Sequence, residues 1–357
     1  MRIAQLVPAL HHGDAIGNDA MVLRNHFSRA GHESAIFYID ADPPVVGEGM
    51  HMSAFPDWIR GGARSVTILH YALPSPLSDL FRTAPDRRIL VYHNITPPAF
   101  LSGYPHLQHI SREGRRALAD LKTVPDVSVG DSEYNRLELV DMGFKNTLEI
   151  PICIDFGAYD EPPCPITMKM FSVRDMVTFL FVGRVTPNKC QHDIIRLYAM
   201  YKRTVNPRCR LFLVGKYTGF LDYLWRCQKA VNRLGIGDVH FTGRVSHREL
   251  LAYYRMSDVF VSMSEHEGFG VPLVEAMYMD IPVMAFHAAA VPCTMGSAGI
   301  LFRRKDRWME LAELAGMLIA DPEFRQRVIA GQRSRLKDFQ HKTVSRKWDT
   351  VVSDLTA

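Results

Sequence analysis

The sequence has 357 residues, of which 47% are hydrophobic and 22% charged, and its formal net charge is +4. This length exceeds what one hydrophobic core usually supports, so we expect two domains of ordinary globular composition. The weak positive charge argues against nucleic-acid binding, and the six cysteines lack zinc-ligand spacing. The first residues form a strand pattern and not a signal peptide, and every apolar run is too short to span a membrane, so we expect a cytoplasmic protein.

Short apolar runs alternate with stretches of helical periodicity through the first half of the chain. The runs lie at residues 3–7, 35–39, 66–69, 89–92, 127–129 and 148–150. The first helical stretch is Asn18–Ala30, with Asn18 as its expected cap and Gly31 at its end. This alternation predicts parallel βαβ units in a doubly wound α/β sheet, which binds ligands beyond the carboxyl ends of its strands.

Two of these strand ends carry candidate ligand-binding residues. After the first run, Gly13 and Gly17 bracket a loop suited to approach phosphate or sugar, although it lacks the G-x-G-x-x-G spacing of nicotinamide-cofactor sites. After the fourth run, His93 is followed by the polar residues Asn94 and Thr96. The position of His93 suits a ligand contact, and a histidine satisfied by neighbouring backbone groups is an equally good alternative.

Two features imitate metal sites. Asp40-Ala-Asp42 resembles the acidic triplet with which some transferases hold a divalent cation, but Pro43-Pro44 beside it favours a solvated turn. The adjacent His11 and His12 point in different directions, and the sequence offers no third ligand. We therefore predict that the protein binds no metal.

Residues 100–123 combine interleaved leucine and isoleucine with a set of basic side chains. The basic residues are His106, His109, Arg112, Arg115 and Arg116. The pattern suits either an amphipathic helix at an anionic membrane surface or a surface helix that packs its apolar stripe on the sheet. We favour the second.

A proline-rich seam, residues 151–165, separates the two halves, and we place the boundary near 155–172. Apolar runs then recur at residues 177–182, 211–214, 239–241, 259–262, 283–286 and 300–302, which predicts a second sheet. We expect an N-terminal domain at 1–160, a C-terminal domain at 173–338 and a final helix at 339–357. Two similar α/β domains favour a ligand site in a cleft between them.

The first strand of the second half runs into Gly183-Arg-Val-Thr-Pro-Asn-Lys189. Gly183 permits a tight turn, and Arg184 and Lys189 place two cations at the carboxyl end of the strand. A guanidinium and an ammonium together suit a diphosphate better than a single carboxylate. The alternative is a pair of charges that are merely solvated.

The segment from Glu265 to Glu275 reads as a tight glycine loop and then a helix that starts near Val271, with Pro272 in its first turn. The free amides of such a helix start favour an anion. Glu267 lies in the loop and Glu275 in the helix. The alternative is a plain turn with a solvated acidic rim.

In combination, Gly183-Arg184 with Lys189, Phe241-Thr-Gly243, and Ser264 through Glu275 resemble the carboxy-terminal domain of glycosyltransferase family 4, the group 1 glycosyltransferases. The resemblance is strong over residues 177–305 and weaker over the N-terminal half. It implies the GT-B fold, in which two Rossmann-like domains face each other across a cleft. It also implies a retaining enzyme that uses a sugar nucleotide.

The resemblance assigns roles to particular residues. Arg184 and Lys189 would hold the donor diphosphate, Glu267 the sugar hydroxyls and Glu275 the ribose. His93 would meet the transferring sugar near its anomeric carbon, as an orienting or charge-stabilising group and not as a nucleophile. The implied donor site comprises Gly17, Gly183, Arg184, Lys189, Glu267, Gly268, Phe269, Gly270, Val271 and Glu275, and the implied catalytic residues are His93 and Glu267.

The implied partners are a GDP- or UDP-sugar donor and a glycan or lipid-linked oligosaccharide acceptor, as in bacterial lipopolysaccharide or other polysaccharide synthesis. No cofactor is implied, and peripheral contact with the inner face of the membrane would follow from a lipid-linked acceptor. The final helix would cross back to the N-terminal domain. Alternatives are a nucleotide-sugar epimerase of the same fold and a non-catalytic nucleotide-sugar-binding protein.

The sequence departs from the family pattern at two positions. Asp280 stands where the family usually has glycine, and Cys293 stands where glutamate is common. The second departure leaves open how the loop around Cys293 helps to close over the nucleotide.

Overall fold

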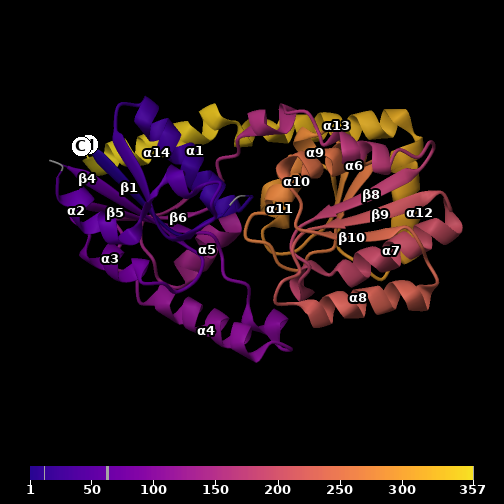
Figure 1. Cartoon of the computed structure of the whole chain (residues 1–357), viewed down its shortest axis with the longest axis horizontal. Coiled ribbons are helices and arrows are strands. Elements are labelled where there is room, and N and C mark those ends of the chain that lie inside the picture. The colour runs from indigo at the N-terminus through magenta and orange to yellow at the C-terminus, as the bar shows by residue number, and fades with distance from the viewer. Residues whose placement is uncertain (12, 62–63, 357) are drawn as a thin grey trace. The chain divides into compact units, whose positions relative to one another are not determined.

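The computed structural model describes residues 1–11, 13–61 and 64–356. The chain forms two compact units, one made of Met1–Asp155 with Asp338–Ala357 and the other of Phe156–Lys337. Each unit is built on a parallel sheet flanked by helices (Figure 1). The α/β fold class predicted from the alternating pattern is confirmed.

The first unit contains a seven-stranded parallel sheet in the order β3-β2-β1-β4-β5-β6-β7. Its strands are β1 (Arg2–Leu10), β2 (Glu33–Ala41), β3 (Met50–His51), β4 (Ser65–Tyr71), β5 (Arg87–Tyr92), β6 (Val127–Gly130) and β7 (Thr147–Glu149). All six predicted strands are present. The additional edge strand β3 is too short to produce a periodic signal.

Helices flank this sheet. They are α1 (Ala15–Arg29), α2 (Phe55–Arg60), α3 (Leu77–Thr83), α4 (Pro105–Ala119), α5 (Glu133–Asp141) and α14 (His341–Thr356), with short 3-10 helices η1 (Val46–Glu48), η2 (Met52–Ala54) and η3 (Pro98–Leu101). The predicted start of the first helix at Asn18 is wrong. Asp14 is the cap, because its side chain accepts a hydrogen bond from the Gly17 amide at 3.1 Å.

The C-terminal helix α14 completes the core of the first unit. Trp348 and Val352 pack with Ile3 of β1 and Leu23 of α1 in one buried cluster. The Trp348 ring meets Phe27 of α1 edge to face, with centroids 6.3 Å apart, and α14 runs beside α1 in Figure 1. The last helix is therefore structurally part of the unit that begins with residue 1.

The second unit contains a six-stranded parallel sheet in the order β10-β9-β8-β11-β12-β13. Its strands are β8 (Val177–Val182), β9 (Cys209–Val214), β10 (Val239–Gly243), β11 (Val259–Ser262), β12 (Val283–Phe286) and β13 (Ile300–Phe302). All six match predicted apolar runs. Thr178, Phe179, Leu180, Phe212 and Val283 are almost fully buried, as expected for strands covered on both faces.

The helices of the second unit precede, connect and follow these strands. They are α6 (Pro165–Met170), α7 (Gln191–Thr204), α8 (Leu221–Leu234), α9 (His247–Arg255), α10 (Val271–Tyr278), α11 (Val291–Met295), α12 (Trp308–Ala320) and α13 (Pro322–Leu336), with 3-10 helices η4 (Phe156–Asp160), η5 (Pro187–Lys189) and η6 (Lys337–Phe339) at its ends and connections. Ser246 and Glu249 form the predicted capping box of α9.

In both sheets the strand order reverses beside the first strand of the unit. The reversal lies between β1 and β4 in the first sheet and between β8 and β11 in the second. In doubly wound sheets this switch point opens a crevice at the carboxyl ends of the strands, where ligands bind. The loops that leave β8 and β11 are the two that carry the predicted donor-binding motifs.

Candidate functional site

The glycine loop after β11 leads directly into α10, as predicted. Helix α10 begins at Val271, Gly270 is its N-cap residue and Pro272 lies in its first turn. Gly270 has φ +92°, a conformation that side-chain-bearing residues rarely adopt, and an added Cβ would lie 2.9 Å from Leu273 Cδ1. Glycine is therefore required where the chain turns into this helix.

Lys189 and Glu267 form an ion pair at the switch point of the second sheet. Lys189 belongs to the loop after β8 and Glu267 to the loop after β11, and these strands are neighbours. Their side chains are 19% and 14% exposed, so the pair is shielded but still reachable. Two residues that the sequence assigned to one ligand are thus in contact within one unit.

Asn188 fastens the two loops together. Its side-chain nitrogen donates to the His266 carbonyl at 3.2 Å, and its own carbonyl accepts from the Glu265 amide at 2.8 Å. The Thr186 hydroxyl donates to the side-chain oxygen of Asn188 at 2.8 Å. Asn188 directly precedes Lys189 and is buried, and its role as a link between the loops has no signal in the sequence.

Gly183 and Arg184 occupy the start of the same β8 loop. Gly183 has φ +151°, and a Cβ added at the neighbouring Gly215 would lie 2.1 Å from the Gly183 carbonyl oxygen. The backbone at Gly183 therefore lies too close to Gly215 for that residue to carry a side chain. The exposed Arg184 guanidinium lies over the Phe220 ring, 5.5 Å from its centroid.

Glu275 is buried inside the second unit. Tyr254 of α9 and Tyr159 of η4 each donate a phenolic hydrogen bond to its carboxylate, one to each oxygen. Burial raises the pKa of Glu275, and the two hydrogen bonds partly oppose this rise. Any ribose hydroxyl that binds this carboxylate must therefore replace or share a tyrosine contact, which the sequence did not reveal.

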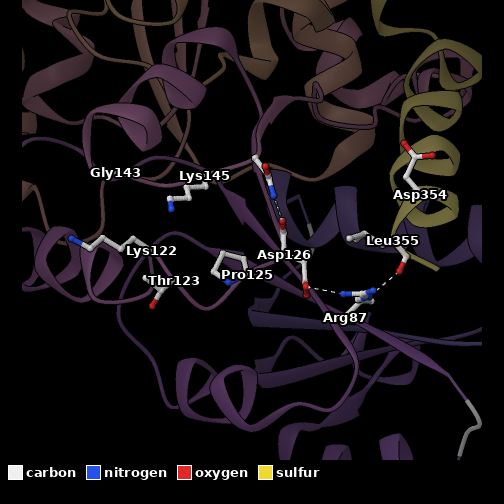
Figure 2. Close-up of a pocket in the computed structure, with 10 residues that line it drawn as sticks. Arg87, Lys122, Thr123, Pro125, Asp126, Gly143, Lys145, Asp354 and Leu355 are labelled. Carbon is white, nitrogen blue, oxygen red and sulfur yellow. Dashed lines mark hydrogen bonds and ion pairs between the residues drawn. The ribbon is translucent and has the colours of Figure 1, made fainter. Parts of the chain in front are cut away.

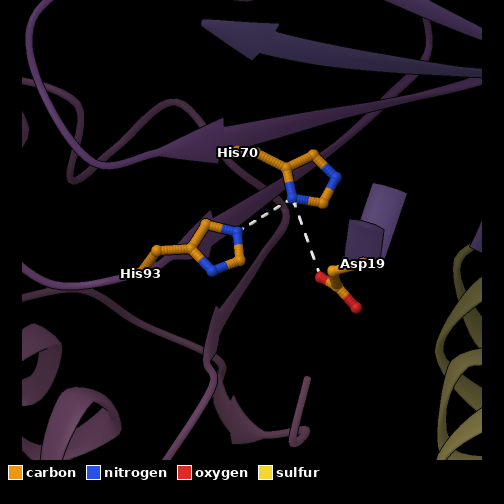
Figure 3. Close-up of side chains that lie close together, drawn as sticks. All are labelled: Asp19, His70 and His93. Atoms are coloured by element: carbon orange, nitrogen blue, oxygen red, sulfur yellow. Dashed lines mark hydrogen bonds and ion pairs between the residues drawn. The ribbon is translucent and has the colours of Figure 1, made fainter. Parts of the chain in front are cut away.

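His93 lies in the first unit, directly after β5, within a buried polar cluster. Its Nε2 is 2.9 Å from His70 Nδ1, and His70 Nδ1 is 4.0 Å from Asp19 Oδ2, as Figure 3 shows. The other ring nitrogen, Nδ1, lies 3.3 Å from Asp131 Oδ2. Both ring nitrogens of His93 thus have partners within the first unit. This resembles the alternative predicted from the sequence, a histidine satisfied by its neighbours, except that the partners are side chains and not backbone groups.

Gly17 lies inside the first turn of α1 and not in the loop before it. Its amide hydrogen bonds to Asp14, and a Cβ added there would make only ordinary contacts, the nearest at 3.4 Å to Leu10 Cδ1. Beside it, His11 is paired with Asp40 at 2.9 Å. His12 lies outside the described residues.

Two groups of described residues bring metal-type ligand atoms within 4.8 Å of one another. The first group is Cys190, His192 and Asp193. Its carboxylate already has a positive partner, because the Lys305 ammonium lies 3.2 Å from Asp193. In Asp19, His70 and His93 the two imidazole nitrogens are at hydrogen-bond distance. Both groups therefore have interactions that account for their closeness without an ion.

A hollow of about 610 Å³ opens at the opposite, amino-terminal ends of β5, β6 and β7 in the first unit. In Figure 2 Arg87 bridges Asp126, at 3.2 Å, and the Leu355 carbonyl, at 2.9 Å. These contacts connect the C-terminal end of α14 to the amino-terminal end of β5. The hollow contains none of the predicted site residues.

Helix α4 carries the predicted basic residues, and all of them except Arg115 are exposed. Arg115 turns inward and donates to the Ile95 carbonyl at 2.7 Å and to Glu138 at 3.1 Å. Arg112 and Arg116 are exposed, as are both histidines of the helix. Within residues 1–11, 13–61 and 64–356, every helix is too short or too polar to cross a bilayer.

Residues 171–335 match the family Glycosyl transferases group 1. The chain is 27% identical over 251 residues to the O-antigen chain mannosyltransferase B of Escherichia coli, and this alignment covers 65% of each of the two chains. It is also 27% identical to the GDP-mannose-dependent alpha-(1-6)-phosphatidylinositol monomannoside mannosyltransferase of Mycolicibacterium smegmatis, over 64% of this chain and 62% of that protein.

Solved structures with the same fold include HepE of Anabaena in complex with UDP-glucose, with a TM-score of 0.77 and 18% identity over 99% of this chain and 100% of that one. WaaG, a glycosyltransferase involved in lipopolysaccharide biosynthesis, has a TM-score of 0.69 and 12% identity over 98% and 99%. The matched regions span 62–65% of the length of the two mannosyltransferases. Residues 171–335 therefore carry the sequence pattern of the group 1 glycosyltransferases.

Proposed function

We propose that this group 1 glycosyltransferase moves a hexosyl group from a GDP- or UDP-sugar to a hydroxyl group of a glycan or lipid-linked acceptor, with retention and without a metal. The observation that carries the proposal is the shielded Lys189–Glu267 pair at the switch point of the second sheet, in which Glu267 lies in the loop that leads into α10. A cation, a carboxylate and a helix start in one place suit a diphosphate linked to a hydroxyl-rich sugar.

Donor binding then redistributes existing contacts. The diphosphate takes the Lys189 ammonium, with Arg184 from the same loop, and the Glu267 carboxylate becomes available to the sugar hydroxyls. The backbone of Gly268, Phe269, Gly270 and Val271 approaches the sugar and the distal phosphate. Glu275 receives the ribose after one tyrosine contact yields.

In the proposed reaction the bond between the anomeric carbon and the diphosphate oxygen breaks while the acceptor oxygen attacks from the same face. The leaving diphosphate takes the acceptor proton, and Lys189 and Arg184 stabilise the charge that develops on it. A covalent route would need a carboxylate nucleophile at the anomeric carbon. In the proposed complex Glu267 binds the sugar hydroxyls and Glu275 is held by tyrosine hydroxyl groups, so neither carboxylate is assigned as a nucleophile, which supports the front-face route.

Mannose is the first donor sugar to test, because two relatives are named mannosyltransferases, one of them GDP-mannose-dependent. UDP-glucose is the second, since it is bound in a solved structure of the same fold. A thermal-shift panel of GDP-mannose, UDP-glucose and ADP-glucose, each against its free nucleotide, identifies the nucleotide and the sugar. Transfer from the stabilising donor to membrane and glycan extracts then tests the activity.

The outcomes separate the alternatives. Product formation that depends on acceptor supports the proposal. Release of nucleotide and sugar from donor alone, without acceptor, favours an epimerase-type reaction. Tight donor binding without turnover in any extract favours a binding protein, and no stabilisation by any sugar nucleotide contradicts the proposal altogether.

A lipid-linked acceptor would bring the enzyme to an anionic membrane surface, and the exposed basic face of α4 is the proposed contact. Co-sedimentation with vesicles containing phosphatidylglycerol tests it. Binding at low salt should fall in a variant that carries both Arg112→Gln and Arg116→Gln. Arg115→Gln should leave binding unchanged, provided that the protein still folds without the Arg115–Glu138 ion pair. Absence of binding by the unmodified protein at low salt contradicts the contact.

A further inference from the structure

The tautomer of His70 is fixed by Gln5. The Gln5 side-chain nitrogen donates to the Ala20 carbonyl at 2.9 Å, so its oxygen faces His70 Nε2, 3.0 Å away. Because that oxygen can only accept, His70 Nε2 carries the proton. All these groups are buried, so water does not offer an alternative partner.

His70 Nδ1 must then be a bare acceptor. Burial, followed by the charge of His93, lowers the pKa of His70 well below its ordinary value, so the ring is neutral. A neutral imidazole with a proton on Nε2 has a lone pair on Nδ1. His93 Nε2, 2.9 Å away, must therefore be the donor in this contact. The two rings are parallel within 8°, which lets the N–H point along the lone pair.

The second ring nitrogen of His93 faces a carboxylate. His93 Nδ1 lies 3.3 Å from Asp131 Oδ2, while Asp131 Oδ1 accepts a hydrogen bond from Asn135. A hydrogen bond to a carboxylate requires a proton on Nδ1. With a proton on each nitrogen, His93 is an imidazolium.

The surroundings of His93 favour this charge. Burial disfavours it, but the hydrogen bond and charge of Asp131, then the charges of Asp19 and Asp14, outweigh burial and raise the pKa of His93. Asp19 comes from α1, Asp14 from the N-cap of that helix, His70 from β4 and Asp131 from the turn after β6. Residues from each of these elements thus converge on one ring.

We propose that His70 and Asp131 are positioning residues that hold His93 as a doubly protonated, fixed positive charge, so that His93 does not transfer protons during the reaction. The part of this inference that concerns catalysis rests on the proposed glycosyl transfer. The protonation state itself does not, because it follows from contacts within the first unit alone.

Selective ¹⁵N labelling of histidine tests the protonation state directly. In the intact protein we expect both His93 nitrogens to be protonated at pH 7.5, and His70 to remain neutral with its proton on Nε2. His93→Asn and His70→Gln assign the signals by their loss, and His70→Gln keeps an acceptor for His93. A neutral His93 at pH 7.5 overturns the proposal, as does a stoichiometric bound metal, measured by elemental analysis, that His70→Gln removes.

Asp131→Asn separates positioning from mere structure. It keeps the side-chain shape and removes the charge, so we expect the His93 titration midpoint to fall by at least one pH unit. In the proposed transfer, kcat at alkaline pH should fall at least tenfold while the KM for donor stays within twofold. Asp126→Asn, at the other end of β6, is the matched control and should leave both the titration and kcat unchanged.

The outcomes remain distinguishable from failure of the proposed function. An unchanged His93 titration in Asp131→Asn overturns the inference, even if transfer activity is lost. If the titration moves but no donor is ever turned over, the proposed function fails and the assignment of the imidazolium stands. If the titration moves and kcat does not, the catalytic part of the inference is overturned.

Discussion

The ammonium of Lys189 is in contact with the carboxylate of Glu267, and each side chain is held by a loop that leaves a neighbouring strand. Each of these two charges is therefore the other's counterion. A ligand that carries both phosphate and hydroxyl groups can bind each of them without leaving either charge unpaired. This arrangement predicts different consequences for the loss of each partner.

Lys189→Ala and Glu267→Ala should each lower transfer by roughly 10² to 10³-fold but affect nucleotide binding differently. Without Glu267, the uncompensated ammonium still attracts the diphosphate, so stabilisation by GDP or UDP should persist. Without Lys189, an uncompensated carboxylate repels it, and stabilisation should be lost. Thermal shift with free nucleotide, beside a transfer assay, checks both.

Lys202→Ala is the matched control, because Lys202 is also 19% exposed and paired with a carboxylate, Asp238, in the same unit. It should change neither property. Near-normal transfer in both the Lys189 and Glu267 variants, with unchanged unfolding temperatures, contradicts the assigned donor site.

The two tyrosines on Glu275 should differ in what they do. Tyr254 is fully buried, so Tyr254→Phe leaves a buried carboxylate short of a donor and should destabilise the protein by about 1–3 kcal/mol. Tyr159 is partly exposed, so Tyr159→Phe should cost less. If ribose replaces the Tyr159 contact, Tyr159→Phe should leave the donor KM unchanged or lower it, whereas Tyr254→Phe raises it. If Tyr159→Phe raises the donor KM and Tyr254→Phe does not, the ribose does not replace the Tyr159 contact.

Sequence patterns predicted the parts of the site that lie in continuous segments. The strand, glycine loop and helix around Val271 appear as expected, because a left-handed glycine, an early proline and flanking apolar runs are local signals. The same holds for Gly183, Arg184 and Lys189, which follow β8 within a few residues. The contact between Lys189 and Glu267 depends on which strands are neighbours, and sequence periodicity does not encode strand order.

The cluster around His93 could be predicted only in part. His93 is predictable because it directly follows a strand, but His70 lies within an apolar strand and Asp19 within a helix, where polar residues give no local sign of function. Asp131 directly follows β6, so the rule that predicts His93 applies to Asp131 as well. Tyr159 and Glu275 lie on separate elements, and their contact is a tertiary feature.

Asp19 should make stability fall with rising pH. Burial raises its pKa from 3.8 to about 6, against the favourable charge of His93 and a hydrogen bond from the Cys153 amide. Between these values the unfolded chain has lost the Asp19 proton and the folded chain keeps it, so the free energy of unfolding decreases as pH rises and stays lower above about 6. Below 3.8 both states are protonated and the effect is absent.

Asp19→Asn should therefore raise stability at pH 8 by up to about 3 kcal/mol and leave it unchanged near pH 3.5. Its side-chain oxygen still accepts from the Cys153 amide, a contact of 2.8 Å in the unmodified protein. Urea unfolding across this pH range measures the difference. Asp57→Asn, whose side chain is 91% exposed, is the control and should show no such pH dependence. A loss of stability at pH 8 that is absent at pH 3.5 would mean that the charge of Asp19 is stabilising, and would contradict this prediction.

Trp348 tests whether α14 is an integral part of the first unit. The side chain is 1% exposed and packs edge to face on Phe27, so Trp348→Ala should destabilise the protein by about 3–5 kcal/mol. Trp225→Ala, at a site that is 55% exposed, should change stability by less than about 0.5 kcal/mol. Because the proposed nucleotide contacts lie in the second unit, stabilisation by GDP or UDP should survive in Trp348→Ala at temperatures where the variant is folded. A cost below about 1 kcal/mol for Trp348→Ala, as for an exposed residue, would mean that the helix is only a peripheral cap.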